Sequence, residues 1–146
     1  MLKFDRAIFT AFVAERIEDK ATREAIFDLL EFALENALKV VGGASNTNFH
    51  YIVGTSNGSA MLFYCDASGG VEMSLGNFPE LSTATVSKFL RNLGSSPGYK
   101  YVRRFEDRRL KGGTQGFLIK ETLVDPTIMK KFKSAVIELQ RTITEG

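Results

Sequence analysis

The sequence is poor in the residues that build disulfide-bonded, metal-binding and membrane proteins. It has one cysteine, one histidine and no tryptophan among its 146 residues. A lone cysteine cannot form an internal disulfide and is typical of proteins from a reducing compartment. No apolar run is long enough to span a membrane, and Lys3, Asp5 and Arg6 interrupt the amino-terminal segment before it resembles a signal peptide. We therefore expect a cytoplasmic protein that does not contact a membrane.

The short motifs of common catalytic and cofactor sites are also missing. The sequence contains no Walker A loop, no Gly-x-Gly-x-x-Gly after an expected strand, and no Cys or His pair at metal-binding spacing. Asp66 and Glu72 flank an expected turn, and the residues after Glu72 do not form the Glu-x-Lys arrangement of restriction-type nucleases. We therefore expect no enzymatic activity, no metal and no cofactor.

Residues 48–75 carry the strongest fold signal, which is three antiparallel strands joined by two tight turns. The expected strands cover residues 49–53, 61–65 and 71–75. Asn57-Gly58 would supply the two positive-φ positions of a type I′ hairpin turn, and residues 66–70 would form the second turn. Pairing about Asn57-Gly58 would place His50 opposite Cys65.

Helices are expected on both sides of this meander. Asp5 would cap a helix over 5–18, and a longer helix over 22–41 would end at Gly42-Gly43. Ser82 would cap a helix over 82–93, and Asp125-Pro126 would begin a last helix. The apolar face of that last helix consists of Met129, Phe132, Ala135, Val136, Leu139 and Ile143. Two more short strands are expected at 99–105 and 117–119.

These elements predict an α+β fold, because helices and antiparallel strands are segregated along the chain rather than alternating. We expect a single domain over residues 1–146. In it, the three-stranded antiparallel meander is extended by one or two further strands and packs against helices. The helix over 5–18 is a candidate for an added docking element.

Several segments of the chain together resemble a known kind of domain. They are residues 29–36 followed by Gly42-Gly43, residues 60–65, 70–75 and 89–93, and Phe117-Leu118-Ile119 before Asp125-Pro126. They are similar to a small uncharacterised α+β domain of bacterial proteins that sometimes occurs alongside restriction or nuclease-type domains. The resemblance covers roughly residues 25 to 143 and consists of core positions and turns. It implies a bacterial source and a link to nucleic-acid handling, and it brings no catalytic residues.

One segment concentrates positive charge. Between positions 100 and 111 there are six cations and two acids, Glu106 and Asp107, whereas the whole chain has a net charge of +2. Aromatic residues are interleaved with the cations, as in surfaces that bind single-stranded nucleic acids. One alternative interpretation is a solvated or protein-facing loop, and another is a contact with the acidic long helix of a second copy across a homodimer interface. The polyanion-binding candidates are Lys100, Arg103, Arg104, Arg108, Arg109, Lys111, Tyr99 and Tyr101.

His50 and Cys65 are the two residues that would matter most to an enzyme. Both fall in expected strands, and no third group that could orient a catalytic pair is evident. A packed strand histidine and a buried thiol explain them without chemistry.

Three functions therefore remain open. The favoured one is a non-catalytic protein-interaction or self-association module, with a protein partner or a second copy docking on Phe9, Phe12 and Val13 of the first helix. The second is a nucleic-acid-binding accessory domain that uses residues 99–116. The third is an enzyme with an unrecognised site near His50 and Cys65.

Overall fold

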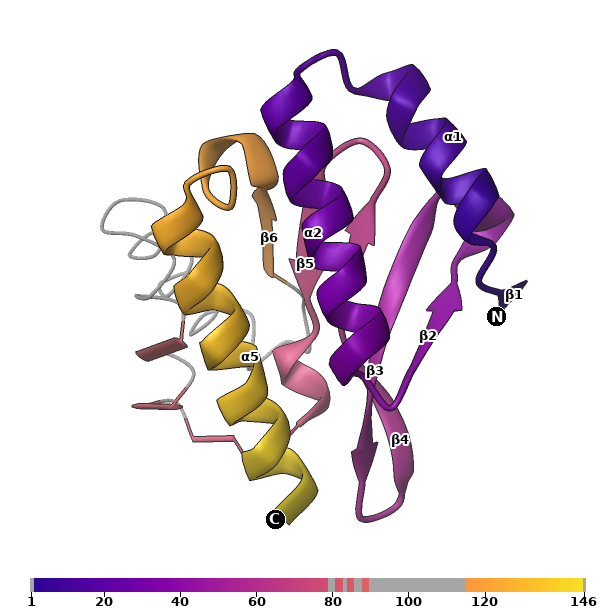
Figure 1. Ribbon diagram of the computed structural model, residues 1–146. Coiled ribbons are helices and arrows are strands. Elements are labelled where there is room, and N and C mark those ends of the chain that lie inside the picture. Colours follow the sequence, from indigo (N-terminus) through magenta and orange to yellow (C-terminus); the bar gives the residue numbers. More distant parts are fainter. Residues whose placement is uncertain (1, 79–80, 83, 86–87, 90–114, 146) are drawn as a thin grey trace.

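The computed structural model describes residues 2–78, 81–82, 84–85, 88–89 and 115–145 (Figure 1). In chain order, the elements begin with β1 (Leu2–Lys3), α1 (Arg6–Arg16), α2 (Lys20–Asn36), β2 (Lys39–Gly42), the 3₁₀ turn η1 (Ala44–Asn46), β3 (Asn48–Thr55) and β4 (Gly58–Asp66). They continue with β5 (Gly70–Met73), η2 (Leu75–Asn77), β6 (Gln115–Leu118), η3 (Ile119–Glu121) and α5 (Pro126–Glu145).

The strands form one antiparallel sheet in the order β1-β2-β3-β4-β5-β6, so each strand pairs with its neighbours in sequence. The helices α2 and α5 cross the same face of this sheet (Figure 1). Two hydrogen bonds join these helices: Lys133 Nζ donates to Asp28 over 2.7 Å, and Gln140 Nε2 donates to the carbonyl of Asn36 over 3.0 Å. The α+β class and the β3-β4-β5 meander are therefore confirmed. The sheet extends beyond the meander at both edges.

The core lies between the helices and the sheet. Its rings pack edge to face around Phe132 of α5, whose centroid is 5.7 Å from that of Phe63 and 5.8 Å from that of Phe117. All six apolar positions expected on the inner face of the last helix are buried. A regular 3.6-residue repeat identified this face correctly, because the helix is long and one-sided.

Aspartate caps begin the three described helices. Asp5, Asp19 and Asp125 each accept hydrogen bonds from backbone N–H groups in the first turn of the helix that follows. These N–H groups have no partner inside the helix, so the carboxylates satisfy them. The expected helix starts at Asp5 and Asp125 are confirmed. Helix α2 begins at Lys20, two residues before the expected start at residue 22, and Asp19 caps it.

The prediction that the second helix continues to residue 41 is wrong. Residues 39–42 form strand β2, and α2 ends at Asn36. The N–H of Leu38 donates to the carbonyl of Ile52 over 2.9 Å, so pairing with β3 begins directly after the helix. Pairing with the distant strand β3 overrides the helical periodicity of residues 39–42. The β-branched side chains of Val40 and Val41 favour the strand conformation. Gly42-Gly43 therefore ends a strand rather than a helix.

The predicted hairpin register is also wrong. His50 pairs with Tyr64, and Cys65 pairs with Phe49. A bulge at Leu62 shifts the pairing between Tyr51 and Ile52. At the turn, Gly58 has a φ of 132° and Asn57 is not among the residues with positive φ, so the type I′ turn is absent. The turn is centred on Ser56-Asn57 rather than on Asn57-Gly58, since Thr55 pairs with Gly58, and the extra residue of the bulge in β4 then moves the pairing by one residue.

The expected strand at 99–105 lies outside the described residues. So does most of the expected helix over 82–93. The expected cap of that helix is present, since the N–H of Thr85 donates to Ser82 Oγ over 3.1 Å.

Candidate functional site

The polyanion-binding candidates lie outside the part of the chain that the structure describes, and their role stays a prediction. They are Tyr99, Lys100, Tyr101, Arg103, Arg104, Arg108, Arg109 and Lys111.

The expected docking patch on the first helix is not an exposed surface. Phe9 and Val13 are fully buried, and Phe12 is half-buried against the core. The ring of Phe9 packs edge to face on Phe49 of β3, with centroids 5.4 Å apart. The interpretation of these residues as exposed is wrong, because the apolar stripe of α1 is part of the same core as the sheet.

His50 and Cys65 do not form a catalytic pair. Cys65 is fully buried on the core side of β4, and burial raises the pKa of its thiol, which keeps the sulfur protonated. His50 occupies the opposite side of the sheet, because adjacent strand positions point to opposite faces and His50 pairs with Tyr64 rather than Cys65.

That opposite side of the sheet, here called the outer face, carries a continuous row of side chains across five strands. Directly paired residues point the same way, so the row runs Lys3, Val41, His50, Tyr64 and Glu72. A second row beside it consists of Lys39, Ile52 and Met61. Phe49, Tyr51 and Val53, which alternate with these positions along β3, belong to the core.

The middle of the outer face is apolar and separate from the core. Ile52 is only 5% exposed and yet is not part of the core cluster. Val41 and Met61 are half-buried beside it and also lie outside the cluster, whereas Val40 packs against the core. The sheet therefore supports two apolar surfaces, one on each side.

An aromatic pair lies at the centre of the outer face. The rings of His50 and Tyr64 stack with centroids 5.4 Å apart and an interplanar angle of 25°. His50 Nε2 is 3.0 Å from Asn48 Oδ1, and burial lowers the pKa of His50, so the ring is neutral at pH 7. Burial and a hydrogen bond to Glu72 raise the pKa of Tyr64, so its hydroxyl remains a donor.

A shallow hollow of about 320 Å³ lies at the β5–β6 end of the outer face. Gly70 and Gly116 leave its floor without side chains, and Leu118, which is 40% exposed, lines it. The carboxylates of Glu72 and Glu121 border the hollow. This end of the face is therefore acidic, whereas Lys3 and Lys39 make the β1–β2 end basic.

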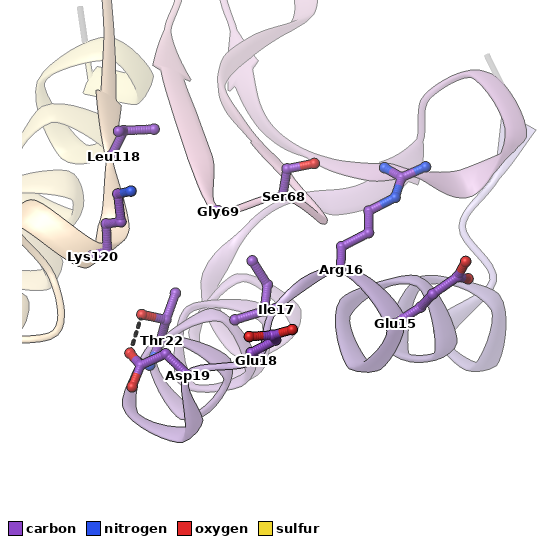
Figure 2. Close-up of a pocket in the computed structure, with 10 residues that line it drawn as sticks. All are labelled: Glu15, Arg16, Ile17, Glu18, Asp19, Thr22, Ser68, Gly69, Leu118 and Lys120. Atoms are coloured by element: carbon purple, nitrogen blue, oxygen red, sulfur yellow. Dashed lines mark hydrogen bonds between the residues drawn. The ribbon is translucent and has the colours of Figure 1, made fainter.

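A second depression, a cleft of about 450 Å³, lies where the α1–α2 connection meets the β4–β5 turn (Figure 2). Figure 2 shows Arg16 and Lys120 on opposite sides of it, with Ser68 and Gly69 between them. Asp19 at its base accepts hydrogen bonds from the N–H and the hydroxyl of Thr22, and these bonds lower the pKa of the carboxyl. The cap orders the corner between the two helices, so this carboxylate has a structural role.

Among the described residues, no three His, Cys, Asp or Glu side chains come close enough together to hold a metal ion. None of the described helices has the length and apolar character needed to cross a membrane. Comparison with protein families, with curated proteins and with solved structures found no match.

The expected sites included no residue of the outer face as a binding residue. The alternation of side chains along residues 48–53 and 60–65 indicated that each strand has a second face. It could be interpreted only with the correct register, which the position of the turn and the bulge at Leu62 set together.

Proposed function

We propose that this protein is a non-catalytic self-association module in which two copies pack their outer faces together. The observation that supports this most strongly is the second apolar surface around Ile52, Val41 and Met61, outside the core. Val41 and Met61 are partly exposed around the buried Ile52, and apolar side chains gathered on one sheet face are characteristic of surfaces that bind another protein. Sheets also pack face to face about 10 Å apart in ordinary β-sandwiches, so the geometry is a common one.

A second copy fits this face because the face carries both signs of charge. Its apolar centre lies between a basic end, with Lys3 and Lys39, and an acidic end, with Glu72 and Glu121. A surface of this kind is complementary to itself, which a two-fold symmetric interface requires. It matches a wholly acidic or wholly basic partner less well.

The size of the face sets the expected strength. Five strands at about 4.8 Å spacing and five residues at about 3.3 Å rise give roughly 20 Å by 17 Å, or about 350 Å² per partner. Stable interfaces bury about 800 Å² per partner, so a weak, transient dimer is expected.

Analytical ultracentrifugation over a range of concentrations tests the proposal. The wild-type protein is expected to pass from monomer to dimer, and Met61→Asp on the outer face is expected to weaken the dimer at least about tenfold. Leu34→Asp is the matched control, because Leu34 is 42% exposed on α2, away from the outer face. A wild-type protein that stays monomeric to about 1 mM, or equal weakening by both variants, would refute the proposal.

A nucleic-acid-binding role is the second candidate, and the charge of residues 100–111 favours it. Six cations against two acids in twelve positions give a local net charge of +4. Fluorescence anisotropy with short DNA and RNA at two salt concentrations tests this role, since phosphate contacts make affinity fall steeply with salt. Binding that disappears when Arg103, Arg104, Arg108 and Arg109 are all replaced by Glu would support it. No binding at low salt would contradict a nucleic-acid-binding role.

A further inference from the structure

We infer that His50 makes self-association through the outer face depend on pH: the two copies pack while both His50 rings are neutral and separate when the rings are protonated. This inference rests on the proposed self-association and adds its regulation. A module of this kind dissociates as its surroundings become more acidic, which is a common use of histidine in proteins.

His50 lies in the middle of the surface that self-association covers. It is the central residue of the row across the sheet, with Val41 on one side and Tyr64 on the other. Along β3 it lies two positions from Ile52, the buried residue of the apolar centre. Any face-to-face packing that covers this centre also covers His50. Because a two-fold interface uses the same surface on both copies, each dimer contains two such histidines.

The hydrogen bonding of the ring suits the neutral form. His50 Nε2 lies 3.0 Å from Asn48 Oδ1, a carbonyl oxygen that only accepts, so Nε2 carries the proton and Nδ1 carries the lone pair. Nδ1 is shielded from solvent, and no group of the described residues donates to it. Protonation would turn Nδ1 into a buried N–H donor that has no acceptor within the described part of the chain. An unpaired buried donor of this kind is costly.

The surroundings of the ring leave little room for another orientation. One face of the ring stacks on Tyr64, with centroids 5.4 Å apart. The side chain of Asn48 lies where residue 43 has no side chain, since a Cβ on Gly43 would overlap Asn48 Oδ1. A ring that turned to expose Nδ1 would lose both the stack and the hydrogen bond to Asn48. The unpaired nitrogen therefore belongs to the packed arrangement of this face.

Protonation opposes association through the linkage between proton binding and dimerisation. In the single copy, burial already lowers the pKa of His50 from its ordinary value of about 6.5. A second copy would remove more water from the ring and bring a second imidazolium into the same interface, so the pKa would fall further in the dimer. Association is then full above the His50 pKa of the single copy and weakens as pH falls through it. Because each dimer contains two such rings, the association constant falls by up to about 100-fold per pH unit.

Other titratable groups also face His50 on the outer side of the sheet. Asp66 belongs to this side because it pairs with Asn48. The full set consists of Lys3 on β1, Lys39 on β2, Tyr64 and Asp66 on β4, and Glu72 on β5. Lysine and tyrosine side chains in general titrate near pH 10, and carboxylates near pH 4. The α-amino group, whose charge also lowers the His50 pKa, belongs to a class that titrates at about pH 8. His50 is the only histidine of the chain, so a variant at this one position isolates its contribution.

Two measurements on the wild-type protein test the inference. The single histidine gives unambiguous imidazole signals in ¹H–¹³C NMR, so the His50 pKa can be measured in dilute and in concentrated protein. The concentrated protein is expected to show the lower pKa. Analytical ultracentrifugation is then run from about one pH unit above the dilute-protein pKa to about one unit below it. Association is expected to be at least about tenfold weaker at the acidic end.

Variants assign the effect to His50. His50→Phe keeps an aromatic ring beside Tyr64 and cannot be protonated, so it is expected to associate at all these pH values. Asn48→Asp places a carboxylate beside Nε2, which raises the His50 pKa, so the loss of association is expected to move to higher pH. Lys131→His introduces a histidine at an exposed position of α5, away from the outer face. This control is expected to follow the wild-type pH profile.

The outcomes separate the two proposals. A wild-type protein that associates at none of these pH values would overturn both. Equal association above and below the His50 pKa, or a His50→Phe variant that keeps the wild-type loss, would overturn the pH dependence and leave self-association standing. Circular dichroism verifies the fold of each variant at each pH. If His50→Phe does not fold, Asn48→Asp decides: a raised His50 pKa with the loss of association still at the wild-type pH would refute the inference.

Discussion

Replacing Phe132 with alanine tests whether one aromatic cluster holds the last helix to the sheet. The Phe132 ring is fully buried, and its centroid lies 5.7 Å from the centroids of Phe63 and Phe89 and 5.8 Å from that of Phe117. Truncating a buried phenylalanine to alanine costs about 3–5 kcal/mol, against a total stability of about 5–15 kcal/mol for a domain. We therefore expect Phe132→Ala to lose a large part of the free energy of unfolding.

A second substitution separates ring contacts from volume. Phe132→Leu keeps most of the buried volume but removes the edge-to-face contacts, and we expect a loss of about 1.5–2.5 kcal/mol. Urea unfolding followed by circular dichroism measures both variants, with Lys131→Ala at the exposed neighbouring position as control. A loss below about 1 kcal/mol for Phe132→Ala would refute the description of this cluster as the junction between α5 and the sheet.

Two further predictions concern polar contacts. Tyr51→Phe removes the hydroxyl that donates to Gln140 Oε1. We expect a loss of about 1 kcal/mol in urea unfolding, and no change would mean that water replaces the donor. The hydrogen bonds from Thr22 lower the pKa of Asp19, so its carboxylate stabilises the folded state above the unfolded pKa of about 3.9. This contribution should be lost as pH falls through the lowered folded pKa, and Asp19→Asn should remove this part of the acid dependence. An unchanged acid profile would contradict the cap.

Local chemistry was enough to predict the last helix. The core face from Met129 to Ile143 repeats at helical spacing, and Asp125 followed by proline marks the start. Both signals lie within the helix itself, so no distant contact was needed to interpret them. The amino-terminal helix was likewise predicted from Asp5, but whether its apolar face is exposed depended on the packing of Phe9 against the sheet.

Strand β2 could not be predicted, because its conformation depends on a distant partner. Val40 and Val41 continue the apolar pattern of α2, and only pairing with β3 turns them into a strand. The outer face depends on register in the same way. A one-residue shift moves every side chain of a strand to the other side of the sheet, and the bulge at Leu62 introduces such a shift.

The measurement that tests the central claim most directly is a dilution series followed by two-dimensional ¹H–¹⁵N NMR. Self-association through the outer face predicts concentration-dependent shifts at Val41, His50, Met61 and Tyr64. Residues on the exposed sides of α2 and α5 should not change. Shifts confined to the helices, or spectra that do not change with concentration, would contradict the account.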